Sequence, residues 1–336
     1  MCYYFENLSL FFRTVKTHTM HKHTLVAVIA LASFFSSAQS IYDHEKIEAK
    51  SGNESNLMMG ADAIYADNWD QLAQPQFWKK IMLLSPDTFL VNVAATREIL
   101  EVISVKDWSK QTEVEKDLHR DSLRKQFNLP ADERIFVTSG KKDFYKFDVV
   151  YPTISQGVDA FERNGVDPWY AQAILLIESP GQLKKSSAGA YGPFQLMPAV
   201  ARHQGLTVNR SVDERKDFER SAYASSRLIK TICIPEAKRI LEQRNIDYSE
   251  SDLWFRLFVL HVYHAGSLNV AAVVDKIAPE MGGKSLIQAM WQNTAASFGN
   301  NSQNYSQLAL ASQLILNELI YAQCDYVLDC KNTFLE

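Results

Sequence analysis

The sequence predicts a mainly α-helical protein, with a long helical C-terminal part and a smaller, mostly helical N-terminal region. Glycine is scarce, at 13 of 336 residues, against a usual share of ~7%, which indicates few tight turns. Apolar residues make up 46% of the chain, enough to build a core and to exclude a mainly disordered protein. From about residue 150, long helical patterns dominate, with no repeat of fixed period.

Charge and motifs exclude several function classes. The chain carries 35 Lys and Arg against 39 Asp and Glu, a formal net charge of −4. This balance argues against a nucleic-acid binder held by bulk positive charge. There is no Walker or dinucleotide-binding glycine motif, so we expect no nucleic-acid partner and no nucleotide cofactor.

The first 40 residues have the pattern of a secretory signal peptide that starts at Met20. His21, Lys22 and His23 precede an apolar run of residues 25–35, and small residues then lead to a cleavage site ending at Ser40. We therefore expect an exported protein, periplasmic or associated with the cell envelope. An uncleaved membrane anchor is the alternative, but the run is shorter than the roughly 20 residues of a membrane span.

The next two stretches carry no recognisable chemistry. Residues 41–75 are polar and predict a mobile leader. Residues 76–150 predict an N-terminal helical region of unknown role, with residues 96–127 mostly helical. Residues 135–138 are the one short strand candidate there. The catalytic part is expected in residues 151–336.

The cysteines do not predict a metal site. Cys233 lies between two isoleucines and is expected to be a small buried residue. Cys324 and Cys330 are close enough in sequence to form a disulfide in an oxidising compartment. His261 and His264 lie one helical turn apart, but no third ligand stands in a recognisable place, so we expect no metal.

A candidate general acid lies at the end of a buried helix. Asp167 is a good N-cap, and Pro168 suits the first helical position. The following residues are apolar on nearly every face, until Pro180 and Gly181 end the helix just after Glu178. Burial and the negative end of the helix dipole both raise the pKa of a carboxyl group, as a general acid requires. The alternative is a structural Glu paired with Arg or Lys.

Two further segments belong to the same prediction. Residues 186–198 form a loop that carries Gly189 and Gly192, whose small size lets a backbone approach a ligand. An apolar helix over residues 252–264 ends at Gly266, a C-cap that would leave Tyr263 at the helix end, facing the same cleft as Glu178.

These blocks resemble those of the lytic transglycosylases with a lysozyme-like SLT domain (glycoside hydrolase family 23). The resemblance rests on Ile177-Glu178-Ser179, on the loop from Ser186 to Pro198 and on Tyr263-x-Ala265-Gly266, in the family order. Residues 213–217 resemble the D type of membrane-bound lytic murein transglycosylase, and Asn304-Tyr305 resembles the closing block of the family. The resemblance covers about residues 150–325.

The resemblance implies an enzyme that cleaves the β-1,4 bond between N-acetylmuramic acid and N-acetylglucosamine in peptidoglycan. One Glu protonates the leaving oxygen, then removes a proton from the muramyl C6 hydroxyl, which closes on C1 to leave a 1,6-anhydro end. No obvious second carboxylate stands in the sequence, which fits this mechanism because most glycosidases need two. The implied roles are one acid/base and seven substrate-binding residues: Glu178 as acid/base, and Ser186, Gly189, Gln195, Met197, Tyr263, His264 and Tyr305 toward the substrate.

Two departures and two alternatives stay open. The family usually has Asn where this chain has His264, and the spacer between Glu178 and Ser186 is about one residue shorter than in many members. A lysozyme-type hydrolase would use the same acid with water as nucleophile. A non-catalytic peptidoglycan-binding protein is the other alternative, and the retained Glu178 argues against it. Association with the membrane or with cell-wall machinery, the oligomeric state, and endolytic against exolytic action are not decided by the sequence.

Overall fold

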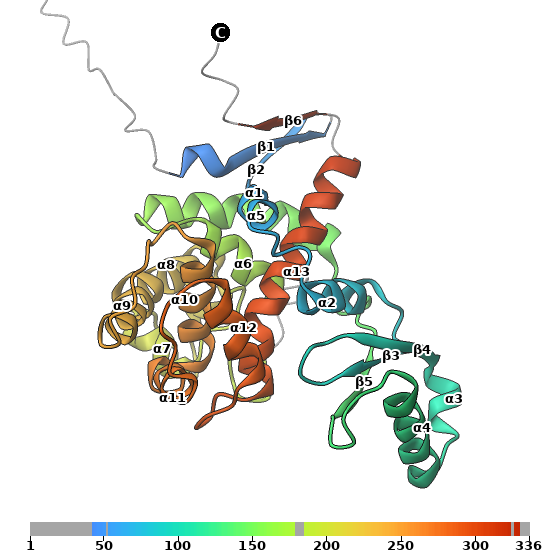
Figure 1. Cartoon of the computed structure of the whole chain (residues 1–336). Helices are drawn as coiled ribbons and strands as arrows, with labels where there is room; N and C mark the ends of the chain where they lie inside the picture. Colours follow the sequence, from blue (N-terminus) through green and yellow to red (C-terminus); the bar gives the residue numbers. More distant parts are fainter. Residues whose placement is uncertain (1–41, 52, 179–184, 324–325, 330–336) are drawn as a thin grey trace, which may run out of the picture. The chain divides into compact units, whose positions relative to one another are not determined.

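The helix α13 (Asn300–Gln323) runs through the middle of a largely helical body. The computed structural model in Figure 1 describes residues 42–51, 53–178, 185–323 and 326–329. The predicted signal peptide and the predicted Cys324–Cys330 pair lie outside these residues. Within them, no helix is long and apolar enough to cross a bilayer.

Three helices pack most extensively on α13, and two of them are apolar on nearly all faces. They are α2 (Ala73–Leu83), α6 (Trp169–Glu178) and α10 (Leu253–Ala265). In α6, every residue from Trp169 to Ile177 is buried. In α10, nine of the residues between Leu253 and Val262 are buried. Such helices form the centre of the core, as predicted for the segment before Glu178.

The outer helices complete the body. They are α5 (Phe147–Arg163), α7 (Pro198–His203), α8 (Phe218–Leu228), α9 (Ile234–Glu242), α11 (Ser267–Ile277) and α12 (Lys284–Gln292). A single π-helical turn, Ile229–Cys233, joins α8 to α9. Cys233 in this turn is buried, as its apolar neighbours predicted.

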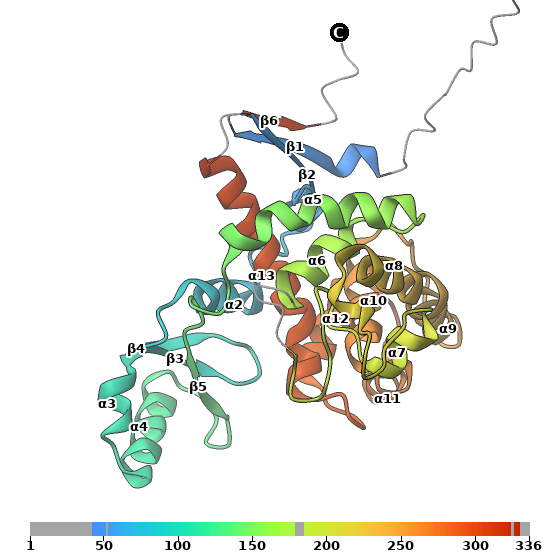
Figure 2. The ribbon, with the colours of Figure 1, turned by 180° about the vertical axis from the view of Figure 1, so that it is seen from behind.

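The segment predicted to be a mobile leader is instead packed on the body. It forms β1 (Lys46–Ser51), β2 (Glu54–Met59) and α1 (Asp62–Ala66). With β6 (Tyr326–Asp329), the two strands make an antiparallel sheet of order β2-β1-β6 (Figure 2). Met58, Met59 and Trp69 are buried. Polar composition suggested a leader, but a few large apolar side chains suffice to dock the segment.

Residues 76–150 contain a second sheet where helix was expected. Its antiparallel order is β4-β3-β5, from β3 (Thr88–Val93), β4 (Ile99–Ser104) and β5 (Ile135–Ser139). The strand expected over residues 135–138 is therefore confirmed. The helix expected over residues 96–127 begins only after β4, as α3 (Val105–Ser109) and α4 (Glu113–Gln126). The β-branched run in β4 pairs with the preceding strand β3 in a hairpin, and this cross-strand pairing outweighs helix propensity.

The boundary placed at residue 150 falls inside helix α5. Contacts also cross it elsewhere, because α2 packs on α13 and β1 pairs with β6. Residues 40–336 form one unit. The N-terminal elements therefore support the helices that carry the candidate site.

Candidate active site

Helix α6 carries Glu178 and is fixed at its other end by a buried ion pair. The carboxylate of Asp167 accepts the backbone N–H of Trp169 at 2.9 Å, which confirms the predicted N-cap. Its second oxygen accepts Nε of Arg256 from α10 at 2.7 Å. The start of α6 is thus held to a neighbouring core helix.

Glu178 is the last residue of α6 and its carboxyl group is poorly solvated. Desolvation by burial raises its pKa to about 7, and the nearby hydroxyl of Tyr305 partly opposes that rise. The side chain keeps some exposed surface, so it remains accessible to a ligand. Among the residues that the structure describes, no Lys or Arg forms an ion pair with Glu178, which disfavours a purely structural, charge-paired role.

Three tyrosines from separate elements lie close enough to sense the charge of Glu178. They are Tyr145, just before α5, Tyr263 on α10 and Tyr305 on α13. Burial raises the pKa of each hydroxyl, and the negative charge of Glu178 raises it further. The fold therefore brings Glu178, Tyr263 and Tyr305 together, as predicted. Tyr145 was missed, because nothing in its local pattern separates it from an ordinary core aromatic residue.

The two histidines of α10 have different roles. His264 is exposed and its ring stacks on Tyr305, with centroids 4.3 Å apart and an interplanar angle of 22°. Neighbouring protein atoms partly desolvate its imidazole, and this lowers the pKa of the ring. His261 is fully buried, with Nε2 2.8 Å from Oγ of Ser306. The described residues contain no cluster of His, Cys, Asp and Glu that could hold a metal ion.

The predicted loop has a strained and closely held backbone. Gly189, Gly192 and Gln195 all have positive φ angles, of 94°, 85° and 44°. Tyr191 and Leu196 form an isolated antiparallel bridge across the turn. The Tyr263 hydroxyl donates to the carbonyl of Phe194 at 2.7 Å. Through this bond, Tyr263 ties the loop to the helix end that lies beside Glu178.

Other predicted residues of the loop have local roles in the structure. Oγ of Ser186 accepts the N–H of Ala190 at 2.9 Å, and Nε2 of Gln195 donates to the carbonyl of Gly192 at 3.0 Å. Met197 precedes α7 and is 40% exposed. Ser186 and Met197 thus have surface available to a ligand, and the substrate contacts of all three residues stay predictions.

Arg215 is the main structural residue that the sequence interpretation missed. Its side chain is buried, and Nη1 donates to the carbonyls of Gly189 and Leu196, each at 2.9 Å. Its other nitrogens form a bidentate pair with Asp213. Arg215 therefore holds the two sides of the loop together through its bonds to Gly189 and Leu196. In the sequence it stands inside a charged run that looks like a helix cap, and Asp217 does cap α8 by accepting the N–H of Arg220 at 2.8 Å.

The contact between the loop and Arg215 also requires a glycine at position 192. A Cβ atom at this position would clash with the backbone oxygen of Arg215. At Gly189, by contrast, a Cβ atom would meet nothing within 4 Å. Gly192 therefore allows close approach of two backbones, whereas Gly189 supplies only a positive φ.

Comparison with protein families finds one match, within this helical part. The model described as the transglycosylase SLT domain matches residues 159–276. The match covers α6, the loop and α10, and ends before Tyr305. It supports a lytic transglycosylase or lysozyme-like family for this part of the chain, without identifying a subtype. Comparison with curated proteins gives no match.

Proposed function

We propose that this protein is a peptidoglycan lytic transglycosylase in which Glu178 acts first as acid and then as base. The observation that carries the proposal is the carboxyl group of Glu178, held by burial at a pKa of about 7 at the end of α6. The match to the SLT domain supports peptidoglycan as the substrate. A carboxyl group with this pKa is present in both protonation states near neutral pH, which suits a single residue with two roles.

In the proposed reaction, protonated Glu178 donates to the glycosidic oxygen between N-acetylmuramic acid and N-acetylglucosamine. The C1–O bond breaks and the N-acetylglucosamine hydroxyl leaves. The carboxylate then removes the proton of the muramyl C6 hydroxyl, whose oxygen bonds to C1 and forms a 1,6-anhydro end. We propose that the nearby Tyr305 hydroxyl donates to the carboxylate during the reaction and stabilises its charged form between the two proton transfers.

The supporting residues act by holding the site in place. Tyr263 bonds to the loop at Phe194, and Arg215 fixes the same loop through Gly189 and Leu196. We propose that Ser186, Gln195, Met197 and the His264–Tyr305 stack contact the sugar chain. The D-type subtype rests only on residues 213–217 and the helix after them, and export to the periplasm rests on the N-terminal pattern.

The test is digestion of purified peptidoglycan with mass analysis of the released fragments. We expect anhydro products, each one water lighter than the reducing-end product of hydrolysis. Glu178→Gln should abolish release while circular dichroism and thermal unfolding show a folded protein. Reducing-end products would favour the lysozyme-type alternative. Release at the wild-type rate by the variant would favour a role for Glu178 outside catalysis.

A further inference from the structure

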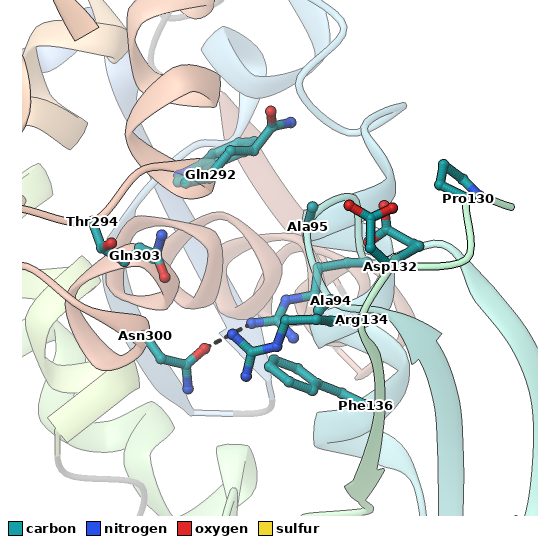
Figure 3. Close-up of a pocket in the computed structure, with 13 residues that line it drawn as sticks. Ala94, Ala95, Pro130, Asp132, Arg134, Phe136, Gln292, Thr294, Asn300 and Gln303 are labelled. Atoms are coloured by element: carbon teal, nitrogen blue, oxygen red, sulfur yellow. Dashed lines mark hydrogen bonds between the residues drawn. The ribbon is translucent and has the colours of Figure 1, made fainter. Parts of the chain in front are cut away.

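A cavity of about 660 Å³ whose lining does not include Glu178 lies between the β3–β4 turn, the segment before β5, and the facing ends of α12 and α13. Figure 3 shows its walls. It contains none of the residues predicted for catalysis or substrate binding. Its lining is mostly polar and charged and includes Arg97, Arg134, Phe136, Asn300 and Gln303. Its volume is within the range of roughly 300–1,000 Å³ found for small-molecule sites.

Arg97 is a buried cation at the wall of this cavity. It is 5% exposed, and its Nη2 donates to Oδ1 of Asn304 at 2.8 Å and of Asn300 at 3.1 Å. Its guanidinium carbon lies 5.5 Å from the centre of the Phe136 ring. In the described part of the chain, no carboxylate forms an ion pair with Arg97. The Arg97 guanidinium also lies over the rings of Phe77 and Trp78. Neutral amides and aromatic faces do not neutralise its charge, and an unpaired buried charge costs several kcal/mol.

A second arginine stands over the same ring. The guanidinium carbon of Arg134 lies 5.1 Å from the centre of Phe136, and the side chain is exposed. Within the described residues, Arg134 has no ion pair either. Both guanidinium groups therefore lie near the ring of Phe136 and line the same cavity, and Figure 3 shows Arg134 beside that ring. Planar guanidinium groups bind carboxylates with two parallel hydrogen bonds.

The cavity lining also includes negatively charged side chains. Asp132 and Glu133 also line the cavity, and neither forms an ion pair with Arg97 or Arg134. Two carboxylates here disfavour a multiply charged anion such as a phosphate ester. They are compatible with a ligand that has one carboxylate and a body of amide or hydroxyl groups. Asn300, Gln303 and Thr294 offer hydrogen-bonding partners for such a body.

We propose that this cavity binds a small ligand with a single carboxylate, held by Arg97 and Arg134 beside Phe136. The ligand has the size of a sugar acid or a dipeptide. If the proposed function is right, both are available from peptidoglycan fragments, as the lactyl carboxylate of muramic acid and as the end of a peptide stem. The identification of peptidoglycan fragments as the ligand rests on the proposed function. The carboxylate site itself rests on the cavity alone.

The test is isothermal titration calorimetry on protein that carries Glu178→Gln, so that no turnover interferes. One pair of probes is N-acetylmuramic acid and N-acetylglucosamine, and the other is N-acetyl-alanyl-alanine and its C-terminal amide. We expect at least one acid to bind at millimolar concentration or below, and its neutral partner to bind at least about tenfold more weakly. The pair that shows the difference identifies the source of the carboxylate.

Arg134→Gln should weaken binding of the acid by about tenfold or more, because one charge-assisted contact is lost. Its side chain is exposed, so the variant should fold. Arg97→Gln should weaken binding further where circular dichroism shows it folded. Arg210→Gln, an exposed arginine outside the cavity, is the matched control and should bind as the parent does.

Equal binding of acid and neutral probe, unchanged binding in Arg134→Gln, or no acid bound at millimolar concentration would overturn the proposal. The two proposals can fail separately. Protein that digests peptidoglycan but binds no acid probe refutes only the cavity site. Protein that binds an acid probe through Arg134 but releases no fragments refutes only the proposed reaction.

Discussion

A carboxyl group with a pKa of about 7 owes that value to its surroundings. Burial raises the pKa of Glu178 from 4.5, and the nearby Tyr305 hydroxyl limits the rise. Both features follow from helix packing, because α6 delivers Glu178 and α13 delivers Tyr305. The sequence could predict the raised pKa from the apolar helix. Tyr305, 127 residues further along the chain, was expected near the site only from the family resemblance, because no local pattern places it beside Glu178.

Removing the Tyr305 hydroxyl should move the pH profile of peptidoglycan cleavage. The acid step needs protonated Glu178, so activity should fall as pH rises through about 7. The Tyr305 hydroxyl favours the carboxylate, so its loss in Tyr305→Phe raises the pKa of Glu178. We therefore expect the alkaline limb of the profile to move up by about one pH unit. The rate of fragment release across a pH series measures it.

Tyr145→Phe is the matched control for that experiment. It removes another hydroxyl near Glu178, but burial and Tyr305 set the pKa of the carboxyl group. We expect its alkaline limb to stay in place. A limb that moves down in Tyr305→Phe, or moves equally in both variants, would contradict the assigned role of the Tyr305 hydroxyl.

At the scale of elements, the loop between α6 and α7 depends on a contact that its own sequence does not reveal. Its glycines and polar residues predicted a close backbone approach to a ligand. In the structure, the close approach at Gly192 is to Arg215, and the same arginine holds the carbonyls of Gly189 and Leu196. In the sequence, Arg215 cannot be told apart from the solvated residues of a charged run. Only the fold shows that its side chain is buried against the loop.

Gly192→Ala should therefore unfold the loop or shift it away from Arg215. The positive φ and the clash together should lower the free energy of unfolding by about 3 kcal/mol or more. Gly189→Ala has the positive φ without the clash, and should lower it by only about 1 kcal/mol. Urea denaturation compares the two variants, and fragment release should fall much more in Gly192→Ala. Similar losses of unfolding free energy in both variants would mean that the positive φ alone explains the effect, and that the contact with Arg215 contributes little.

Helices and strands were predictable to different degrees for a related reason. The segments around Asp167 and Gly266 carry their own caps and apolar faces, so α6 and α10 could be placed from local pattern. The strand β4 could not, because Ile99–Ser104 forms a strand by pairing with β3. Long-range pairing also places β6 beside β1, and β1 and β2 form a hairpin in a stretch whose composition is too polar to predict as core.

At the scale of the whole molecule, the N-terminal segment is part of the support of the site. Gln172 on α6 pairs with both backbone groups of Met59, at 2.9 Å each. Arg256 on α10 binds Glu45 through two hydrogen bonds, of 2.7 and 2.9 Å, in addition to Asp167. Residues 42–59 are thus joined to the two helices that present Glu178 and Tyr263. A separate leader would not show these buried contacts.

Glu45→Gln tests this coupling with little change of shape. The Arg256 side chain is 1% exposed and Glu45 20%, so the pair is poorly screened by solvent. Loss of its charge should lower the free energy of unfolding by about 1–3 kcal/mol. Glu48→Gln is the matched control on β1, since Glu48 pairs with Lys50 at a side-chain exposure of 33% and 43%. It should change stability by less than about 0.5 kcal/mol.

Urea denaturation followed by tryptophan fluorescence and by fragment release should give one coincident transition, shifted in Glu45→Gln alone. Equal stability of both variants, or a fluorescence transition that separates from loss of activity, would show that the N-terminal segment and the catalytic helices unfold independently.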